Sequence, residues 1–254
     1  MERSVHFRAI VVRHTNYDEA DRFITFLTPF QGRVSALAKG VRKMNSRKAG
    51  HLQPFTYVSV QLSKGRGASW LVAQVSTIEA YPDILASLEK TVRTSWVLEL
   101  AERFSLENME NVPLFQLTLD TLRRIAVFPD IFPVQRYFDL HLLSVTGYQP
   151  QLFECVRCHK KIQAEDQYIH YGLGGVLCPD CGSMTRESLK ISMKTLKYFR
   201  YYQTHSFPEA AAAGWPAEIR SESETLLTGY QNYLLERKTN SQRFLEHLDV
   251  SSQS

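Results

Sequence analysis

Features of membrane, secreted and disordered proteins are missing from this sequence of 254 residues. No apolar run approaches the roughly 20 residues that a bilayer-spanning helix needs, and no sustained apolar segment of a signal peptide follows the first residues. With 44% hydrophobic and 22% charged residues, the chain is too apolar for a disordered protein. We therefore expect a cytoplasmic globular protein without membrane contact, built from one large domain or two modest ones.

Catalytic signatures are also missing. The sequence has no G-x-x-x-x-G-K-[ST] phosphate loop, no H-E-x-x-H and no G-x-S-x-G, and its eight histidines accompany no recognisable nucleophile motif. Asp18, Glu19 and Asp21 form an acidic group that could bind a metal ion, but a turn or a solvated face is the simpler interpretation. These absences favour a binding protein over an enzyme.

Acidic residues are absent from residues 31–78. This window holds eight basic residues, so it carries +8 and the rest of the chain −4, given the net charge of +4. Such asymmetry suggests a polyanion partner for one region, and nucleic acid fits better than a merely solvated basic surface. The candidate phosphate contacts are Lys39, Arg42, Lys43, Arg47 and Lys48, followed by Arg33, Lys64 and Arg66.

Short strands are predicted throughout the first 80 residues. β-Branched, aromatic and alternating residues between turn signals mark them at 5–12, 22–28, 33–38, 55–62 and 69–78. Five strands that close on themselves describe a barrel of the OB type, although other small barrels fit the count nearly as well.

The basic cluster at residues 39–50 falls between the third and fourth predicted strands. Its two glycines and low apolar content predict a mobile loop that neutralises phosphates without reading bases. Aromatic residues nearby could stack on bases, although aromatics in barrel strands mostly belong to the core. They are Phe30, Phe55, Tyr57 and Trp70.

After residue 81 the apolar spacing changes to three and four residues, which indicates helices. Helical segments are predicted at 85–104, 113–126, 134–142, 192–204, 217–236 and 242–248, and Ser192 is a plausible N-cap. The fold class is therefore α+β and multidomain. We expect a barrel at 1–80, a helical domain at 81–150 and 186–254, and a cysteine module embedded at 151–185.

All four cysteines lie in one C-x2-C-x19-C-x2-C pattern, formed by Cys155, Cys158, Cys178 and Cys181. Two such knuckles supply four thiolates to one Zn²⁺ and leave no open coordination position, which predicts a structural zinc-ribbon-like site. An iron–sulfur cluster, two disulfides or a redox pair fit the spacing or the compartment less well. His159 and His170 flank the site and are expected to be neighbours rather than ligands.

The order of these parts resembles the bacterial RecO family of recombination mediators, and the resemblance spans nearly the whole chain. It rests on the cysteine pairs and on short motifs along the sequence. In chain order these are Asp21, residues 25–28, Gly32, residues 38–43, 45–47, 53–55, 147–150 and 241–245.

This resemblance implies an OB-fold N-terminal domain, a helical domain and an embedded zinc module. It also implies binding to single- and double-stranded DNA and annealing of complementary strands. Its implied partners are RecR and the C-terminal tail of the single-strand-binding protein SSB, with which it would load RecA onto SSB-coated DNA in the nucleoid.

Two other functions fit parts of the sequence. An RNA-binding barrel protein would show the same strands and basic loop. A zinc-dependent nuclease or deaminase would need an open metal position and a general acid/base such as an H-x-E motif, which the sequence lacks.

Overall fold

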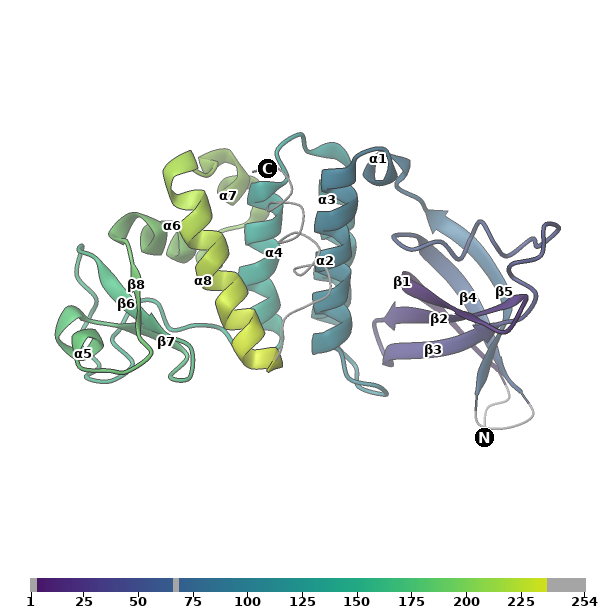
Figure 1. Cartoon of the computed structure of the whole chain (residues 1–254), viewed down its shortest axis with the longest axis horizontal. Helices are drawn as coiled ribbons and strands as arrows, with labels where there is room; N and C mark the ends of the chain where they lie inside the picture. The colour runs from purple at the N-terminus through teal and green to yellow at the C-terminus, as the bar shows by residue number, and fades with distance from the viewer. Residues whose placement is uncertain (1–3, 66–68, 237–254) are drawn as a thin grey trace. The chain divides into compact units, whose positions relative to one another are not determined.

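The computed structural model describes residues 4–65 and 69–236, which fold into two compact units, and the boundary along the chain lies between Val127 and Phe128 (Figure 1). The change of pattern near residue 80 marks the end of the barrel strands. Three helices beyond it belong to the first unit, because the second and third of them pack on the barrel and the first packs on the other two. Within the described ranges, no helix has the length and apolar character needed to cross a membrane.

Five strands form a closed barrel in the order β1-β2-β3-β5-β4. All neighbours are antiparallel except β3 and β5, which pair in parallel through Ala36–Trp70 and Leu37–Leu71. This five-stranded Greek-key closure is the OB-fold that the sequence predicts. The strands are β1 (Ser4–Tyr17), β2 (Asp21–Thr28), β3 (Gly32–Ala38), β4 (Tyr57–Lys64) and β5 (Trp70–Glu79).

Alternation along each strand fills the barrel. Side chains such as Val11, Phe26 and Val60 point inward and are buried together, while their sequence neighbours point outward. Strand β1 ends at Tyr17, five residues beyond the predicted end at residue 12. The prediction stops early because a bulge between Val11 and Arg13 interrupts the alternation of inward and outward side chains.

Helices α1 (Pro82–Leu85), α2 (Leu88–Phe104) and α3 (Val112–Val127) follow the barrel within the first unit. Helix α2 packs on β1 and α3 packs on β2. The ring of Tyr57 on β4 lies 6.0 Å from that of Phe115 on α3. A patch of outward-facing barrel residues is buried near this contact, including Ile10 and Leu27.

The second unit packs helices around Trp215, whose ring lies 5.0 Å from Tyr202 and 5.8 Å from Phe132. A small sheet of order β7-β6-β8 adds Ile169 and Val176 to this core. The elements are α4 (Phe132–Val145), β6 (Gln167–His170), β7 (Gly175–Leu177), α5 (Pro179–Ser183), β8 (Leu189–Ile191), α6 (Met193–Thr204), α7 (Phe207–Ala213) and α8 (Ala217–Leu235).

The predicted helices agree with these bounds to within a few residues, and Ser192 caps α6 by accepting a hydrogen bond from the Thr195 N–H. The sequence patterns give no sign of β8 or α5, which are too short to show a period. The predicted segment 242–248 and the motif 241–245 lie outside the described residues.

Candidate nucleic-acid interface and metal site

The basic loop, defined as residues 39–56 between β3 and β4, is wound into turns and anchored at two points. Val41 and Leu52 are 2% and 1% exposed and belong to the barrel core. Backbone bonds such as Lys43 N–H to Gly40 O (3.2 Å) and Ser46 N–H to Lys43 O (3.0 Å) fold the segment between them. Val41 and Leu52 therefore anchor both ends of a segment that is otherwise low in apolar residues.

Four cations of this loop project into solvent: Lys39, Arg42, Lys43 and Arg47. The side chains of Lys39, Lys43 and Arg47 form no ion pair or hydrogen bond with any other described residue. Arg42 donates from Nη1 to the backbone oxygen of Asp18 at 3.2 Å and pairs with no carboxylate in residues 4–65 or 69–236. The loop thus presents uncompensated positive charge.

Three other predicted phosphate contacts have partners within the fold. Arg33 pairs with Glu107 at 3.1 Å, and Lys48 donates to the Val72 backbone oxygen at 2.7 Å. Lys64 lies over the Trp70 ring, 4.3 Å from its centroid. Arg66 lies outside the described residues.

The acidic group before β2 shapes the loop. The Oδ1 atom of Asp21 accepts from the Gly40 N–H at 2.7 Å, and Oδ1 of Asp18 accepts from the Glu19 N–H at 2.9 Å within a turn. This supports the interpretation of the group as a turn.

Burial and the neighbouring charge of Arg22 lower the pKa of His14, so its imidazole adds no charge near pH 7.

The nearby aromatics divide into core and surface. Phe55 and Tyr57 are 8% and 6% exposed and cannot stack on a ligand. Trp70 is half-buried against the barrel core. Phe30, in the turn between β2 and β3, is 63% exposed and has an accessible ring face.

The four cysteines converge in the second unit. The Sγ atoms of Cys155, Cys158, Cys178 and Cys181 all lie within 4.8 Å of one another, and those of Cys158 and Cys178 are 3.8 Å apart. Tetrahedral ligation with Zn–S bonds of about 2.3 Å separates sulfurs by about 3.8 Å, so the cluster has the dimensions of a zinc site.

Local backbone geometry brings the two knuckles together. A turn closes around the first knuckle through Cys155 N–H to Lys160 O and His159 N–H to Cys155 O, each 2.9 Å. Val156 then bonds to Val176 of β7 at 2.9 Å, which places this turn beside the second knuckle. Strands β6 and β7 form the hairpin that the sequence predicts across residues 167–175.

The close approach of the knuckles requires glycine at position 175. A Cβ atom there would lie 2.8 Å from Cγ1 of Val156 in the first knuckle and 2.4 Å from the Gln151 backbone oxygen, so a larger side chain would push these segments away from β7.

The thiols are electrostatically suited to a cation. Burial disfavours the Cys155 thiolate, but backbone N–H groups of the knuckles, including those of Cys158 and Cys178, outweigh it and lower its pKa to about 6. Desolvation and the neighbouring sulfurs raise the pKa of Cys181 to about 12. Four thiolates at this spacing repel one another, and a bound divalent cation would relieve that repulsion.

The residues present fit a metal ion held by sulfur alone. Among the described residues, the metal-ligating cluster contains neither flanking histidine, and His170 Nδ1 accepts from the Leu173 N–H at 3.1 Å. This agrees with the expectation that His159 and His170 are neighbours.

Comparison with known proteins gives a consistent result along the chain. The family model described as Recombination protein O N terminal matches residues 1–81, and Recombination protein O C terminal matches residues 85–243. The protein named DNA repair protein RecO from Dehalococcoides mccartyi is 36% identical over 241 residues, covering 95% of this chain and 94% of the relative.

Proteins of the same name from other bacteria match as well. The relative from a Roseiflexus species is 34% identical over 96% of this chain and 86% of its own length. That from Pelotomaculum thermopropionicum is 32% identical over 94% of this chain and 92% of its own length.

Proposed function

This chain belongs to the RecO family of DNA repair proteins, and on that premise we propose that it binds DNA through the phosphates and brings complementary strands together. The observation that carries this proposal is the basic loop, where Lys39, Lys43 and Arg47 have no counter-charge among the described residues. Unpaired ammonium and guanidinium groups on an anchored loop can displace the counterions of a sugar–phosphate backbone.

Annealing follows from the same chemistry. Two DNA strands repel each other through their phosphates, and a protein that neutralises both lowers the cost of their approach. Phosphate contacts carry no sequence information, so single- and double-stranded DNA of any sequence would bind. The proposed role is non-enzymatic: the protein holds strands and leaves their covalent bonds intact.

The partners in this proposal are those of a recombination mediator. RecR and the C-terminal tail of SSB would bind this chain, and together they would help RecA to load onto SSB-coated DNA. The site of action would be the cytoplasm, on the nucleoid. The cysteine cluster would hold one Zn²⁺ that closes the β6–β7 module and takes no part in DNA chemistry, since four thiolates leave no open position.

A salt titration tests the proposed interface. The variant Lys39→Ala/Lys43→Ala/Arg47→Ala should bind duplex DNA with a log–log salt slope smaller by about 0.9 for each lost phosphate contact. The matched control Arg186→Ala/Lys190→Ala/Lys197→Ala removes three exposed cations of the second unit and the same charge, and should keep the wild-type slope. An unchanged slope in the loop variant would overturn the assignment.

Annealing is tested directly with complementary strands coated with SSB. The wild-type protein should accelerate duplex formation and the triple loop variant should not. Competition between single-stranded DNA and RNA of the same sequence tests the choice of nucleic acid. Preferential binding of RNA would favour an RNA-binding barrel protein instead.

A further inference from the structure

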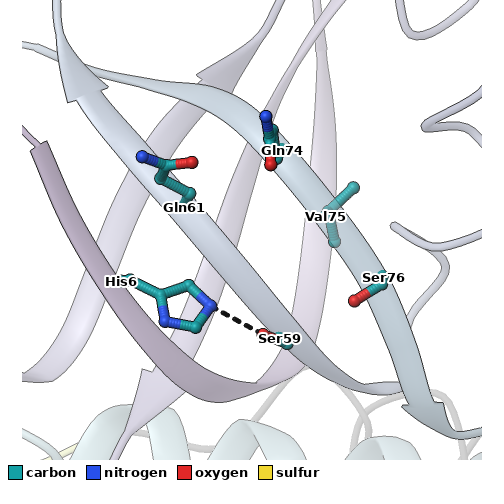
Figure 2. Close-up of a pocket in the computed structure, with 6 residues that line it drawn as sticks. All are labelled: His6, Ser59, Gln61, Gln74, Val75 and Ser76. Atoms are coloured by element: carbon teal, nitrogen blue, oxygen red, sulfur yellow. Dashed lines mark hydrogen bonds between the residues drawn. The ribbon is translucent and has the colours of Figure 1, made fainter.

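Away from the basic loop, two shallow cavities adjoin on the barrel surface. The first lies on the outer face of β1, β4 and β5, has a volume of about 300 Å³ and is lined by His6, Ser59, Gln61, Gln74, Val75 and Ser76 (Figure 2). The second, about 250 Å³, lies between the start of β1 and the turn after β2, and is lined by His6 and Phe30 among others. His6 lines both, and the two cavities together are here called the polar groove.

Register places its polar groups in two rows across three strands. His6 pairs with Gln61 and Gln61 with Gln74, which makes one row. Arg8, Ser59 and Ser76 make the next row in the same way. Neighbouring strands are about 4.8 Å apart, so each row spans about 10 Å of surface with hydrogen-bonding side chains.

Only part of these groups is engaged within the fold. His6 Nε2 and Ser59 Oγ hydrogen-bond to each other at 2.8 Å, the contact that is dashed in Figure 2. The side-chain amides of Gln61 and Gln74 bond to no other described residue, and Arg8 forms no ion pair with one. The two amides thus offer donors and acceptors that could fix the orientation of a ligand.

The charge of this face suits a polyanion. Over the described residues of β1, β4 and β5 there is one carboxylate, Glu79, and Arg123 neutralises it at 2.6 Å. Arg8 lies in the second row, and the imidazole of His6 lies in the first. A ligand that carries negative charge would therefore meet no unpaired carboxylate on these three strands.

The barrel leaves this face open while it covers another. OB-folds commonly bind oligonucleotides on the face of strands 2 and 3. In this chain the outward residues Thr25 and Leu27 of β2 are 5% and 2% exposed, because α3 packs on that strand. Gln74 and Ser76 of β5 remain exposed.

We infer that the polar groove binds the bases of single-stranded DNA, separately from the phosphate contacts of the basic loop. Glutamine amides can pair with the hydrogen-bonding edges of unpaired bases, as they do with adenine in duplexes. The exposed Phe30 ring at the end of the groove offers a stacking surface that tolerates any base. Arg8 lies where it can neutralise a phosphate of the same strand.

This inference rests on the proposed DNA-binding function and adds a base-dependent site to it. A single strand would then have its backbone at the basic loop and some of its bases in the polar groove. Duplex DNA, whose base edges are already paired, would gain little from the groove.

Two probes separate bases from phosphates: a single-stranded oligodeoxynucleotide, and an abasic oligomer of the same length with an identical sugar–phosphate backbone. Gln61→Ala/Gln74→Ala and, separately, Phe30→Ala should each weaken binding of the oligodeoxynucleotide about tenfold. Binding of the abasic oligomer should change less than about twofold, which also shows that the variants are folded.

The control Gln116→Ala/Gln163→Ala removes two exposed glutamines elsewhere and should leave both affinities unchanged. Equal weakening on both probes, or no weakening on either, would overturn the groove. The outcome is independent of the basic loop. A base-dependent loss in the groove variants supports the groove even if the triple loop variant keeps its salt slope, in which case only the proposed loop interface fails.

Discussion

The carboxylate of Asp21 accepts a 2.7 Å hydrogen bond from the backbone N–H of Gly40. Asp21 begins β2 and Gly40, with a φ of 64°, lies at the start of the basic loop. The Asp21 carboxylate thus bonds to the loop backbone, and Lys39, Lys43 and Arg47 form no ion pair with any described residue. This acidic residue therefore helps to position the basic loop and forms no ion pair with its cations.

Removing this carboxylate should loosen the loop. Asp21→Ala is expected to lower the free energy of unfolding by about 1–2 kcal/mol, because a hydrogen bond to a charged group is lost. Glu19→Ala, an exposed acid in the same turn, is the control and should change it by less than about 0.5 kcal/mol. Unfolding in urea measures the free energy of unfolding of both variants. Equal midpoints for wild type and Asp21→Ala would show that the contact is not stabilising.

Glu107 should act as a brake on DNA binding, since it pairs with Arg33 at 3.1 Å. Glu107→Gln would free Arg33 for a phosphate and steepen the salt slope by about 0.9 on duplex DNA. The pair is exposed, so stability should change by less than about 1 kcal/mol. Glu110→Gln makes the same charge change on a nearby exposed residue. If the two variants show the same salt slope, the change in net charge explains the stronger DNA binding and the release of Arg33 does not.

Acid should weaken the contact between β5 and α3. The side chain of Arg123 donates to Glu79 and lowers the pKa of Glu79 below its usual 4.5. The stabilisation is therefore complete above about pH 5 and is lost as the pH falls through the lowered pKa. The difference in unfolding free energy between wild type and Glu79→Gln should be largest near pH 7, at up to about 1 kcal/mol, and should shrink below pH 4.5. A difference that stays constant across this range would contradict the assignment.

Zinc should accompany the purified chain at about one ion per molecule, as four thiolates require. Cys178→Ser should lose it and become sensitive to proteolysis within residues 151–190, because the metal closes that module. Ser183→Ala, an exposed change close to the same knuckle, should retain the metal. Elemental analysis by mass spectrometry measures the content. Full zinc in the Cys178→Ser protein would refute ligation by four cysteines.

Local patterns predict much of this fold. Alternation at residues 55–62 and 69–78 identifies two barrel strands, and helical spacing identifies the longer helices. The C-x2-C pairs predict the metal cluster, because each knuckle is set by residues three apart. Chain closure into an OB-fold depends on the parallel pairing of β3 with β5, which no local pattern encodes. Family resemblance supplies that topology.

The parts that escape prediction depend on contacts between distant segments. Val41 and Leu52 are isolated apolar residues without a period, and only the barrel core explains them. Arg33 and Lys48 look like free cations until Glu107 and Val72 are placed beside them. The polar groove likewise arises from register, which aligns His6 of β1 with glutamines on two other strands.

The two buried anchors of the basic loop also determine where the chain can change in length. Residues 42–51 lie between Val41 and Leu52. An insertion there would extend the basic loop outward while Val41 and Leu52 stay buried in the barrel core. A deletion that reached either anchor would open the core itself. In proteins built on this plan, reach toward a ligand can therefore vary without loss of the scaffold.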